Sequence, residues 1–275
     1  MKEIQVSIIV SVKNEEKNLS HCLDCLKPFT DVIIVDSNSI DKTPEIAKKY
    51  DRKLINFNWN GKFPKKRNWV LENLDIKYDW VLFIDADEFL TDNFIQELTK
   101  KTINSSYNAY WISYNNFFMG SEQKHGLKMK KLALFKKNSG RYERIEESNW
   151  SDFDMEIHEH PIISGKIGKI KSTIIHKDFR GLSHYMLKHN QYSDWEVKRY
   201  LQLKNELKHD LTIRQKLKYL LLKTGLLPIS YFMGTYFLKL GFLDGKKGLY
   251  FACYKAFYFF LIVTKLREHS LNNPK

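Results

Sequence analysis

The sequence predicts an α/β fold in which a largely parallel sheet is flanked by helices. In the first hundred of its 275 residues, short apolar runs alternate with segments of helical spacing. This alternation is typical of βαβ units joined by right-handed crossovers. The first run, Val6–Val12, is rich in β-branched residues and has the character of a strand buried on both faces. A hydrophobic share of 43% and an aromatic share of 14% exclude a disordered or low-complexity chain.

The expected elements of this first part follow in order along the chain. The strands are Val6–Val12, Val32–Val35, Lys53–Phe57 and Trp80–Ile84. The helices cover residues 15–26, a segment that begins at residues 41–44, residues 64–74 and a segment that begins at Thr91. Leu19, Cys22 and Leu23 form one apolar stripe of the first helix. Asp41 or Thr43 is the expected N-cap of the second helix, because Pro44 suits its first turn.

From about residue 107 the pattern changes, first to short strands and then to helices. The expected strands are Asn108–Tyr114, Leu132–Lys136 and Ile170–His176, which would extend the sheet in a mixed arrangement. The expected helices cover residues 181–207, 213–224, 228–240 and 245–267. Neither an internal repeat nor a Ser/Gly linker separates the two parts, so we expect the helices to pack on the α/β part.

The charge of the chain is unevenly distributed. Residues 1–168 hold 25 Lys and Arg against 25 Asp and Glu, whereas residues 169–275 hold 20 against 7. The whole formal charge of +13 therefore lies in the last part, which points to nucleic acid, an anionic membrane or another polyanion. Three cysteines and an N-terminus without a secretory pattern indicate a reducing, cytoplasmic location.

The basic segment is also rich in aromatic and aliphatic residues. Its longest uncharged run, Thr224–Leu238, has 15 residues and contains Pro228, whereas a bilayer span takes about 20 apolar residues. We therefore expect amphipathic helices that lie on an anionic membrane surface rather than a transmembrane helix. The alternative is a hydrophobic helix pair that packs on the core or forms a homodimer.

Polar residues follow three of the predicted strands. Ser11, Lys13 and Glu15 lie at or after the first strand, Asp36 follows the second, and the segment Asp85–Glu88 follows the fourth. In open α/β sheets, ligands bind beyond the carboxyl ends of the strands. The sequence therefore predicts that these side chains meet along one edge of the sheet.

The acidic segment Asp85–Glu88 predicts a cation site. Carboxylates crowded at the end of a buried strand would repel one another, and a divalent cation such as Mg²⁺ or Mn²⁺ would remove that penalty. The alternative is that Asp87 or Glu88 caps the following helix. Asp36 has two interpretations as well: it accepts hydrogen bonds from a nucleoside, or it is a turn residue in a segment rich in Ser and Asn.

A basic helix start offers a further candidate site. Lys65, Lys66 and Arg67 lie at the positive end of the predicted helix, where they would meet a diphosphate. The alternative for Lys65 and Lys66 is a solvated helix start.

Taken together, the segments SIIVSVKNEEKNL, VIIVDSNSIDKT, FPKKRNWVLE and VLFIDADEFL resemble family 2 glycosyltransferases in motif, order and spacing. The resemblance implies a GT-A fold with a mixed sheet and a C-terminal helical extension. It also implies inverting transfer of a sugar, such as glucose, from a nucleotide diphosphate donor, most simply a UDP-sugar, with a divalent cation. The expected domains are residues 1–178, with a donor half of 1–100 and an acceptor half of 101–178, and a helical region of 179–275.

The resemblance also implies roles for individual residues. Ser11 and Glu15 match positions around the base and ribose, and Asp36 matches the aspartate that contacts the base. Arg67 matches a basic residue near the donor. Asp85 matches a residue that contacts the sugar nucleotide, and Asp87 matches the cation ligand. Lys13 stands where many members carry a tyrosine. These residues are the expected donor and cation site.

The remainder of the chain resembles bacterial lipopolysaccharide core glucosyltransferases. The matching segments are residues 157–159, His176, residues 185–192, residues 241–248 and Lys265-Leu266. This implies a lipid-linked or oligosaccharide acceptor and Glu159 as the general base, with Glu156 as the rival. His176 would be a further cation or diphosphate ligand, whereas zinc at His158 and His160 or plain structural histidines are the alternatives.

Two other functions remain as alternatives. A sugar-phosphate nucleotidyltransferase would normally carry a glycine-rich loop after the first strand, and the segment VSVKNEEKN has no glycine. Nucleic-acid binding would follow from the basic tail, but no nucleic-acid recognition motif is present. We therefore expect no nucleic-acid partner.

Overall fold

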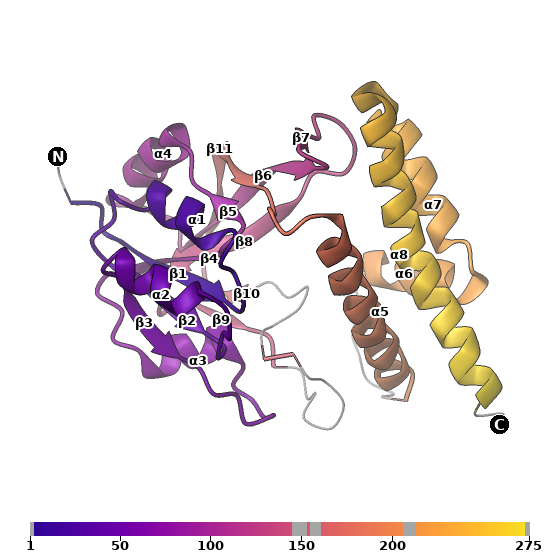
Figure 1. The fold of residues 1–275 in the computed structure, drawn as a ribbon, viewed down its shortest axis with the longest axis horizontal. Coiled ribbons are helices and arrows are strands. Elements are labelled where there is room, and N and C mark those ends of the chain that lie inside the picture. The colour runs from indigo at the N-terminus through magenta and orange to yellow at the C-terminus, as the bar shows by residue number, and fades with distance from the viewer. Residues whose placement is uncertain (1–2, 145–152, 155–160, 206–212, 273–275) are drawn as a thin grey trace. The chain divides into compact units, whose positions relative to one another are not determined.

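The computed structural model describes residues 3–144, 153–154, 161–205 and 213–272 (Figure 1). The chain forms two compact units. The first consists of Met1–Phe117 and Lys128–Phe179, and the second of Phe118–Leu127 and Arg180–Lys275.

The first unit is built on a mixed sheet in which the first four strands of the chain pair in parallel. These four strands are β1 (Val6–Val12), β2 (Val32–Asp36), β3 (Lys53–Asn56) and β4 (Trp80–Asp85). The sheet continues through β8 (Lys130–Lys136), β6 (Ala109–Phe118), β11 (Ile167–His176) and β5 (Glu88–Phe89). The spatial order is β3-β2-β1-β4-β8-β6-β11-β5, with β8 antiparallel to both of its neighbours and β6 parallel to β11. A separate antiparallel pair joins β9 (Gly140–Tyr142) to β10 (Pro161–Ile163). The predicted mixed α/β sheet is confirmed.

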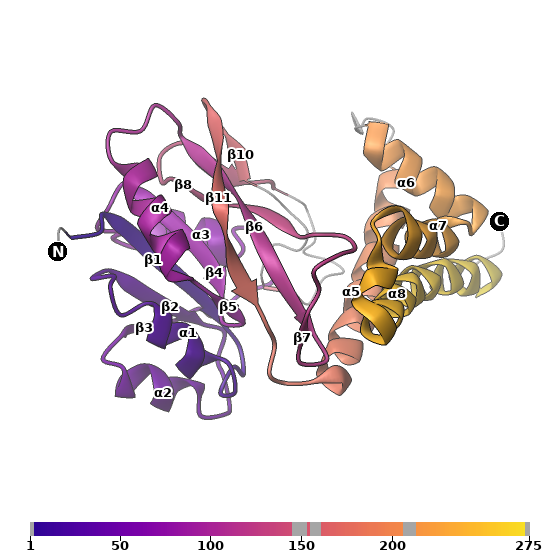
Figure 2. The same cartoon turned by 90° about the horizontal axis from the view of Figure 1, so that it is seen from above.

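Helices cover both faces of this sheet (Figure 2). The helices are α1 (Leu19–Cys25), α2 (Thr43–Lys49), α3 (Lys66–Asn73) and α4 (Asp92–Thr102). Leu23 and Phe94 belong to the core on one face, and Val70 of α3 belongs to the core on the other. Because β1 is covered on both sides, all seven of its residues are buried, as expected for a central parallel strand.

The first helix begins later than the sequence predicts, whereas the second begins within the predicted segment but with a different N-cap. The backbone N–H groups of Glu15 and Glu16 donate to Thr43 Oγ1 at 2.7 Å and Asp41 Oδ2 at 3.0 Å. These contacts hold the β1–α1 loop, so α1 begins at Leu19 rather than at residue 15. Neither Asp41 nor Thr43 is the N-cap of α2; Lys42 occupies that position without a side-chain capping bond. The expected caps instead join two neighbouring loops.

The second unit is helical and has its own core. It contains β7 (Ser121–Glu122), α5 (Leu182–Asn205), α6 (Ile213–Thr224), α7 (Leu227–Met233), the π-helical turn η1 (Gly234–Leu238), η2 (Gly241–Asp244) and α8 (Gly245–Asn272). The predicted helix 228–240 ends early, because Leu240 has a φ of 58°. Val197, Leu222 and Ile262 bring α5, α6 and α8 into one buried cluster. The helices therefore pack on one another.

Two segments of the lipopolysaccharide-type resemblance hold this helical unit together. Lys265 Nζ donates to Asn190 Oδ1 at 2.8 Å and to Asp194 Oδ1 at 2.5 Å, which ties α8 to α5. A Cβ atom on Gly248 would lie 2.0 Å from the carbonyl oxygen of Gly241. These residues therefore have a packing role within the second unit.

The last helix of the chain bears on the expectation that no segment spans a membrane. Among the described residues, Gly241–Asn272 is a 32-residue helical stretch long and apolar enough to cross a membrane, by length and composition alone. The expectation of no such segment rested on uncharged runs, and lysines such as Lys255 interrupt this one. In its most apolar window 28% of the residues are buried, as for a helix that packs only in part against its neighbours.

Candidate donor and cation site

Predicted site residues lie side by side at the C-terminal ends of three adjacent strands, β2, β1 and β4. Ser11 of β1 pairs with Asp85 of β4, and Val12 pairs with Asp36 of β2. Ser11 is 7% exposed and Asp36 is 1% exposed. The parallel register thus places Ser11, Asp36 and Asp85 along one edge, as the strand-end argument predicts.

Three carboxylates crowd the turn after β4. Asp85, Asp87 and Glu88 each have an oxygen atom within 4.8 Å of those of the other two. Two cations meet this cluster: Lys131 Nζ lies 2.7 Å from Asp85 Oδ2, and Arg67 Nη2 lies 3.5 Å from Asp85 Oδ1. Lys131 also donates to Glu88 Oε1. The cluster is therefore partly neutralised by the protein itself.

Burial and charge act in opposite directions on these groups. Burial raises the pKa of Asp85, but Lys131 and Arg67 outweigh it and hold that pKa well below its usual range. Burial raises the pKa of Glu88, and Asp85 adds to the rise against the attraction of Lys131. Burial lowers the pKa of Lys131, yet its two carboxylate partners raise it well above the usual value. Asp85 and Lys131 are therefore a stable ion pair.

Asp87 lies close to His176, the last residue of β11, which is distant from it in the sequence. The β11–β5 pairing sets His176 opposite Glu88, and His176 Nε2 lies 3.5 Å from Asp87 Oδ2. The other ring nitrogen, Nδ1, lies 3.2 Å from Asn116 Oδ1. The two residues predicted as cation ligands therefore lie together. A carboxylate oxygen beside an imidazole, among further carboxylates, suits Mg²⁺ or Mn²⁺, so the donor set fits such an ion.

The helix-cap alternative for this acidic segment is wrong. The N-cap of α4 is Thr91, whose hydroxyl accepts a hydrogen bond from the backbone N–H of Phe94 at 3.2 Å. Asp87 is 3% exposed and Glu88 is fully buried, and both precede that cap. The acidic residues are therefore not explained by the start of the helix.

The loops after β1 and β2 contact each other beside Asp36, where the backbone N–H of Asn14 donates to Ser39 Oγ at 2.8 Å. The carboxylate of Asp36 accepts hydrogen bonds from the backbone N–H of Ser39 at 3.1 Å and from its hydroxyl at 2.5 Å. Asn18 Nδ2 donates to Glu15 Oε2 at 2.8 Å, and Lys13 is exposed. Asp36 thus makes the turn contacts that the Ser- and Asn-rich segment predicts, in a position next to the site.

The start of α3 supplies the basic side of the site. Lys65 and Lys66 are 5% and 2% exposed, so the alternative of a solvated helix start is wrong for both. Lys66 Nζ lies 3.3 Å from Asp154 Oδ2, and burial lowers its pKa. Arg67 stacks over the ring of Tyr142 at 5.2 Å while it pairs with Asp85. Of the three, Arg67 is the one that reaches the acidic cluster.

Sequence reasoning missed Lys131, Tyr114, Asn116 and Asp154 as neighbours of the site. Lys131 lies on β8, one residue before the predicted strand Leu132–Lys136. Pairing of β8 with β4 and β6 brings it to Asp85, and no local spacing reveals that pairing. The candidate bases Glu156 and Glu159 lie outside the described residues, as do His158 and His160.

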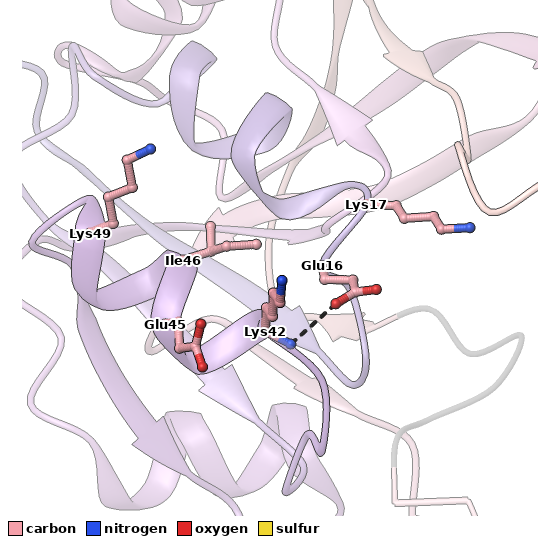
Figure 3. A pocket seen from close by; sticks show the side chains of 6 residues that line it. All are labelled: Glu16, Lys17, Lys42, Glu45, Ile46 and Lys49. Carbon is pink, nitrogen blue, oxygen red and sulfur yellow. Dashed lines mark hydrogen bonds between the residues drawn. The ribbon is translucent and has the colours of Figure 1, made fainter.

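A surface pocket lies between the β1–α1 loop and α2 (Figure 3). It is lined by Glu16, Lys17, Lys42, Glu45, Ile46 and Lys49. Glu16 Oε2 accepts a hydrogen bond from the backbone N–H of Lys42 at 3.3 Å across it. Its lining mixes both charge signs and includes none of the predicted site residues.

The mixed sheet, its covering helices and the acidic turn after β4 define a GT-A fold of the nucleotide-diphospho-sugar transferase class. The family model described as glycosyl transferase family 2 matches residues 7–158, and the chain belongs to this family. The protein is therefore a glycosyltransferase, as the sequence motifs predict.

Similar proteins cover nearly the whole chain. An uncharacterized glycosyltransferase of Rickettsia conorii is 29% identical over 98% of this chain and 92% of its own length. The lipopolysaccharide core biosynthesis glycosyltransferase LpsC of Rhizobium meliloti is 24% identical over 98% of this chain and 94% of its own. A solved glucosyl-3-phosphoglycerate synthase of Mycobacterium tuberculosis, in complex with Mg²⁺ and UDP, aligns at 20% identity over 42% of this chain and 44% of that chain, with a TM-score of 0.32.

Proposed function

We propose that the protein transfers a sugar, with inversion, from a nucleotide diphosphate donor to a hydroxyl of a lipopolysaccharide-core-like acceptor. The observation that carries this proposal is the convergence of Ser11, Asp36 and the carboxylate cluster at the ends of adjacent strands. The full-length similarity to LpsC supports the acceptor class. A UDP-sugar, with glucose as the sugar, is the donor that the sequence resemblance favours.

The donor would lie along the edge formed by these strands. Ser11, Lys13, Glu15 and Asp36 would surround the nucleoside. Arg67, at the positive end of α3, would meet the diphosphate together with the helix dipole. Asp85, held between Arg67 and Lys131, would contact the donor as a carboxylate of fixed orientation. The protein thus supplies preorganised charge where the leaving group gains negative charge.

Asp87 and His176 would hold a divalent cation, Mg²⁺ or Mn²⁺. Such an ion, when bound, neutralises charge on the departing diphosphate. The chain's own residues orient that site: the β11–β5 pairing fixes His176, and Asn116 fixes its ring. In the acceptor step, Glu159 or its rival Glu156 would accept the proton of the attacking hydroxyl.

We further propose that residues 179–275 attach the enzyme to the cytoplasmic face of an anionic membrane, where a lipid-linked acceptor would be reached. The second unit holds 18 Lys and Arg against 7 Asp and Glu. It also exposes an apolar tip, which we define as residues 237–243. The exposed tip residues are Phe237, Leu238, Leu240, Phe242 and Leu243, at 42–81%, and Lys239, Lys246 and Lys247 beside them are exposed too. Apolar side chains next to lysines suit an anionic lipid surface; homodimerisation through the same helices is the alternative.

A donor screen tests the proposed activity. The protein is incubated with a panel of UDP-, GDP-, CMP- and dTDP-sugars, with Mn²⁺ or with EDTA, and release of the nucleotide is measured. We expect one UDP-sugar to be hydrolysed slowly in the presence of Mn²⁺ and not in EDTA. If no donor is hydrolysed and none raises the melting temperature, the proposed donor site is wrong.

A further inference from the structure

We propose that Lys131 is a positioning residue that acts as the built-in counter-ion of the carboxylate cluster. It holds Asp85 and Glu88 in place and thereby directs a divalent cation to Asp87. This inference rests on the proposed function for the presence of a cation, but it concerns a residue that neither the family motifs nor the sequence analysis assigns.

The contacts of Lys131 divide the cluster into two parts. Its Nζ lies 2.7 Å from Asp85 Oδ2, donates to Glu88 Oε1 and sits 5.5 Å from the centre of the Tyr114 ring. On the other side, Asp87 lies 3.5 Å from His176. Asp85 and Glu88 thus both pair with Lys131, while Asp87 faces the imidazole of His176.

Glu88 is unsuited to bind an ion in this arrangement. Its side chain is fully buried. Besides Lys131, the Tyr114 hydroxyl and the backbone N–H of Asp85 donate to its Oε2, each at 3.3 Å. An ion at Glu88 would have to displace these donors inside the protein, where an unpaired polar group is costly. Burial and hydrogen bonding therefore make Glu88 a structural partner of Lys131.

The charge balance explains why a lysine is useful here. Three carboxylates within 4.8 Å of one another face two cations, Lys131 and Arg67. With all three carboxylates ionised and His176 neutral, the cluster keeps one net negative charge, enough to attract a divalent cation, and the loaded site would carry one net positive charge. A diphosphate is attracted to such a site. Without Lys131, the same carboxylates would bind a cation more tightly and leave less positive charge for the donor.

The test compares Lys131→Met with Lys131→Arg, and uses Lys130→Met, its exposed neighbour, as the matched control. Binding of Mn²⁺ without nucleotide is measured by electron paramagnetic resonance, and melting temperature is measured in EDTA and in Mn²⁺. We expect Lys131→Met to bind Mn²⁺ at least about 10-fold more tightly than the wild type, because a nearby positive charge is lost. We also expect Lys131→Met to have a lower melting temperature than the wild type in EDTA, and a larger rise in melting temperature when Mn²⁺ is added. Lys131→Arg and Lys130→Met should behave as the wild type in both measurements.

Several outcomes would overturn the proposal. An unchanged or weaker Mn²⁺ affinity in a cooperatively melting Lys131→Met would show that Lys131 does not oppose the cation. If that variant does not fold, Lys131→Gln, which keeps a donor for Glu88 but no charge, is measured by the same criterion. A wild type that binds no Mn²⁺ would remove the cation from the proposed function as well. If the wild type binds Mn²⁺ with the same affinity as Lys131→Met and Lys131→Gln, this inference alone is refuted.

Discussion

Replacing Asp87 with asparagine is expected to lower kcat/KM for sugar transfer by about a hundredfold or more, while the melting temperature in EDTA stays within about 2 °C or rises. Asparagine keeps the shape of the side chain but removes the charge that would hold the cation beside His176. It also relieves repulsion from Asp85 and Glu88, which lie within 4.8 Å. The measurement is steady-state transfer with the donor identified by the screen, together with thermal unfolding.

The matched control for this prediction is Asp92→Asn. Asp92 is an exposed aspartate in the first turn of α4, five residues further along the chain than Asp87. We expect Asp92→Asn to retain wild-type activity and to lose a few tenths of a kcal/mol of stability, since it gives up a favourable dipole interaction. Wild-type turnover in Asp87→Asn would remove Asp87 from the cation site.

The double substitution Leu238→Ser and Leu243→Ser is expected to weaken binding to anionic vesicles about a hundredfold or more. Leu238 is 81% exposed and Leu243 is 55% exposed in the apolar tip. Burying one leucine side chain in an apolar phase is worth about 1.5–3 kcal/mol, so the two substitutions remove about 3 kcal/mol or more. Because both side chains are exposed in the folded protein, the melting temperature should change little. Co-flotation with phosphatidylglycerol vesicles measures the partition.

The control for the vesicle experiment is Ile40→Ser with Ile103→Ser. These isoleucines are 93% and 57% exposed but lie in the first unit, and we expect their replacement to leave vesicle binding unchanged. Binding of the wild type should fall with added salt and with neutral lipid, since lysines contribute to it. If the wild-type protein does not bind the vesicles, the membrane proposal is wrong. A tip variant that changes from dimer to monomer in light scattering would favour the dimer alternative, and tighter binding to an oligonucleotide than to vesicles would favour nucleic acid.

Much of the fold could be predicted because the central strands are covered on both faces. A strand such as β1 has no solvent side, so its sequence is a short run of buried residues that stands out from the amphipathic helices beside it. The elements that were missed or misplaced depend on distant partners. The two-residue strand β5 exists because it pairs with β11, and α1 begins late because Thr43 binds the loop before it. The hydrophobic and turn patterns within one segment of sequence do not reveal contacts with a distant segment.

The candidate site divides in the same way. The segment Asp85–Glu88 could be identified from the sequence, because several acidic residues directly after an apolar strand are unusual without a cation to balance their charge. His176 was predicted by resemblance, and the β11–β5 pairing brings it 3.5 Å from Asp87. Lys131 and Tyr114 could not be predicted, because β8 and β6 reach the cluster through antiparallel pairings far apart in the sequence. Sequence indicates which residues are chemically notable, and the topology decides which of them meet.

The most direct measurement of the donor and cation site is anomalous scattering from crystals grown with Mn²⁺ and UDP. We predict a manganese peak within bonding distance of an Asp87 carboxylate oxygen and of a diphosphate oxygen, with the nucleoside beyond the ends of β1 and β2. A manganese peak remote from Asp87, or UDP bound away from Ser11 and Asp36, would contradict the account.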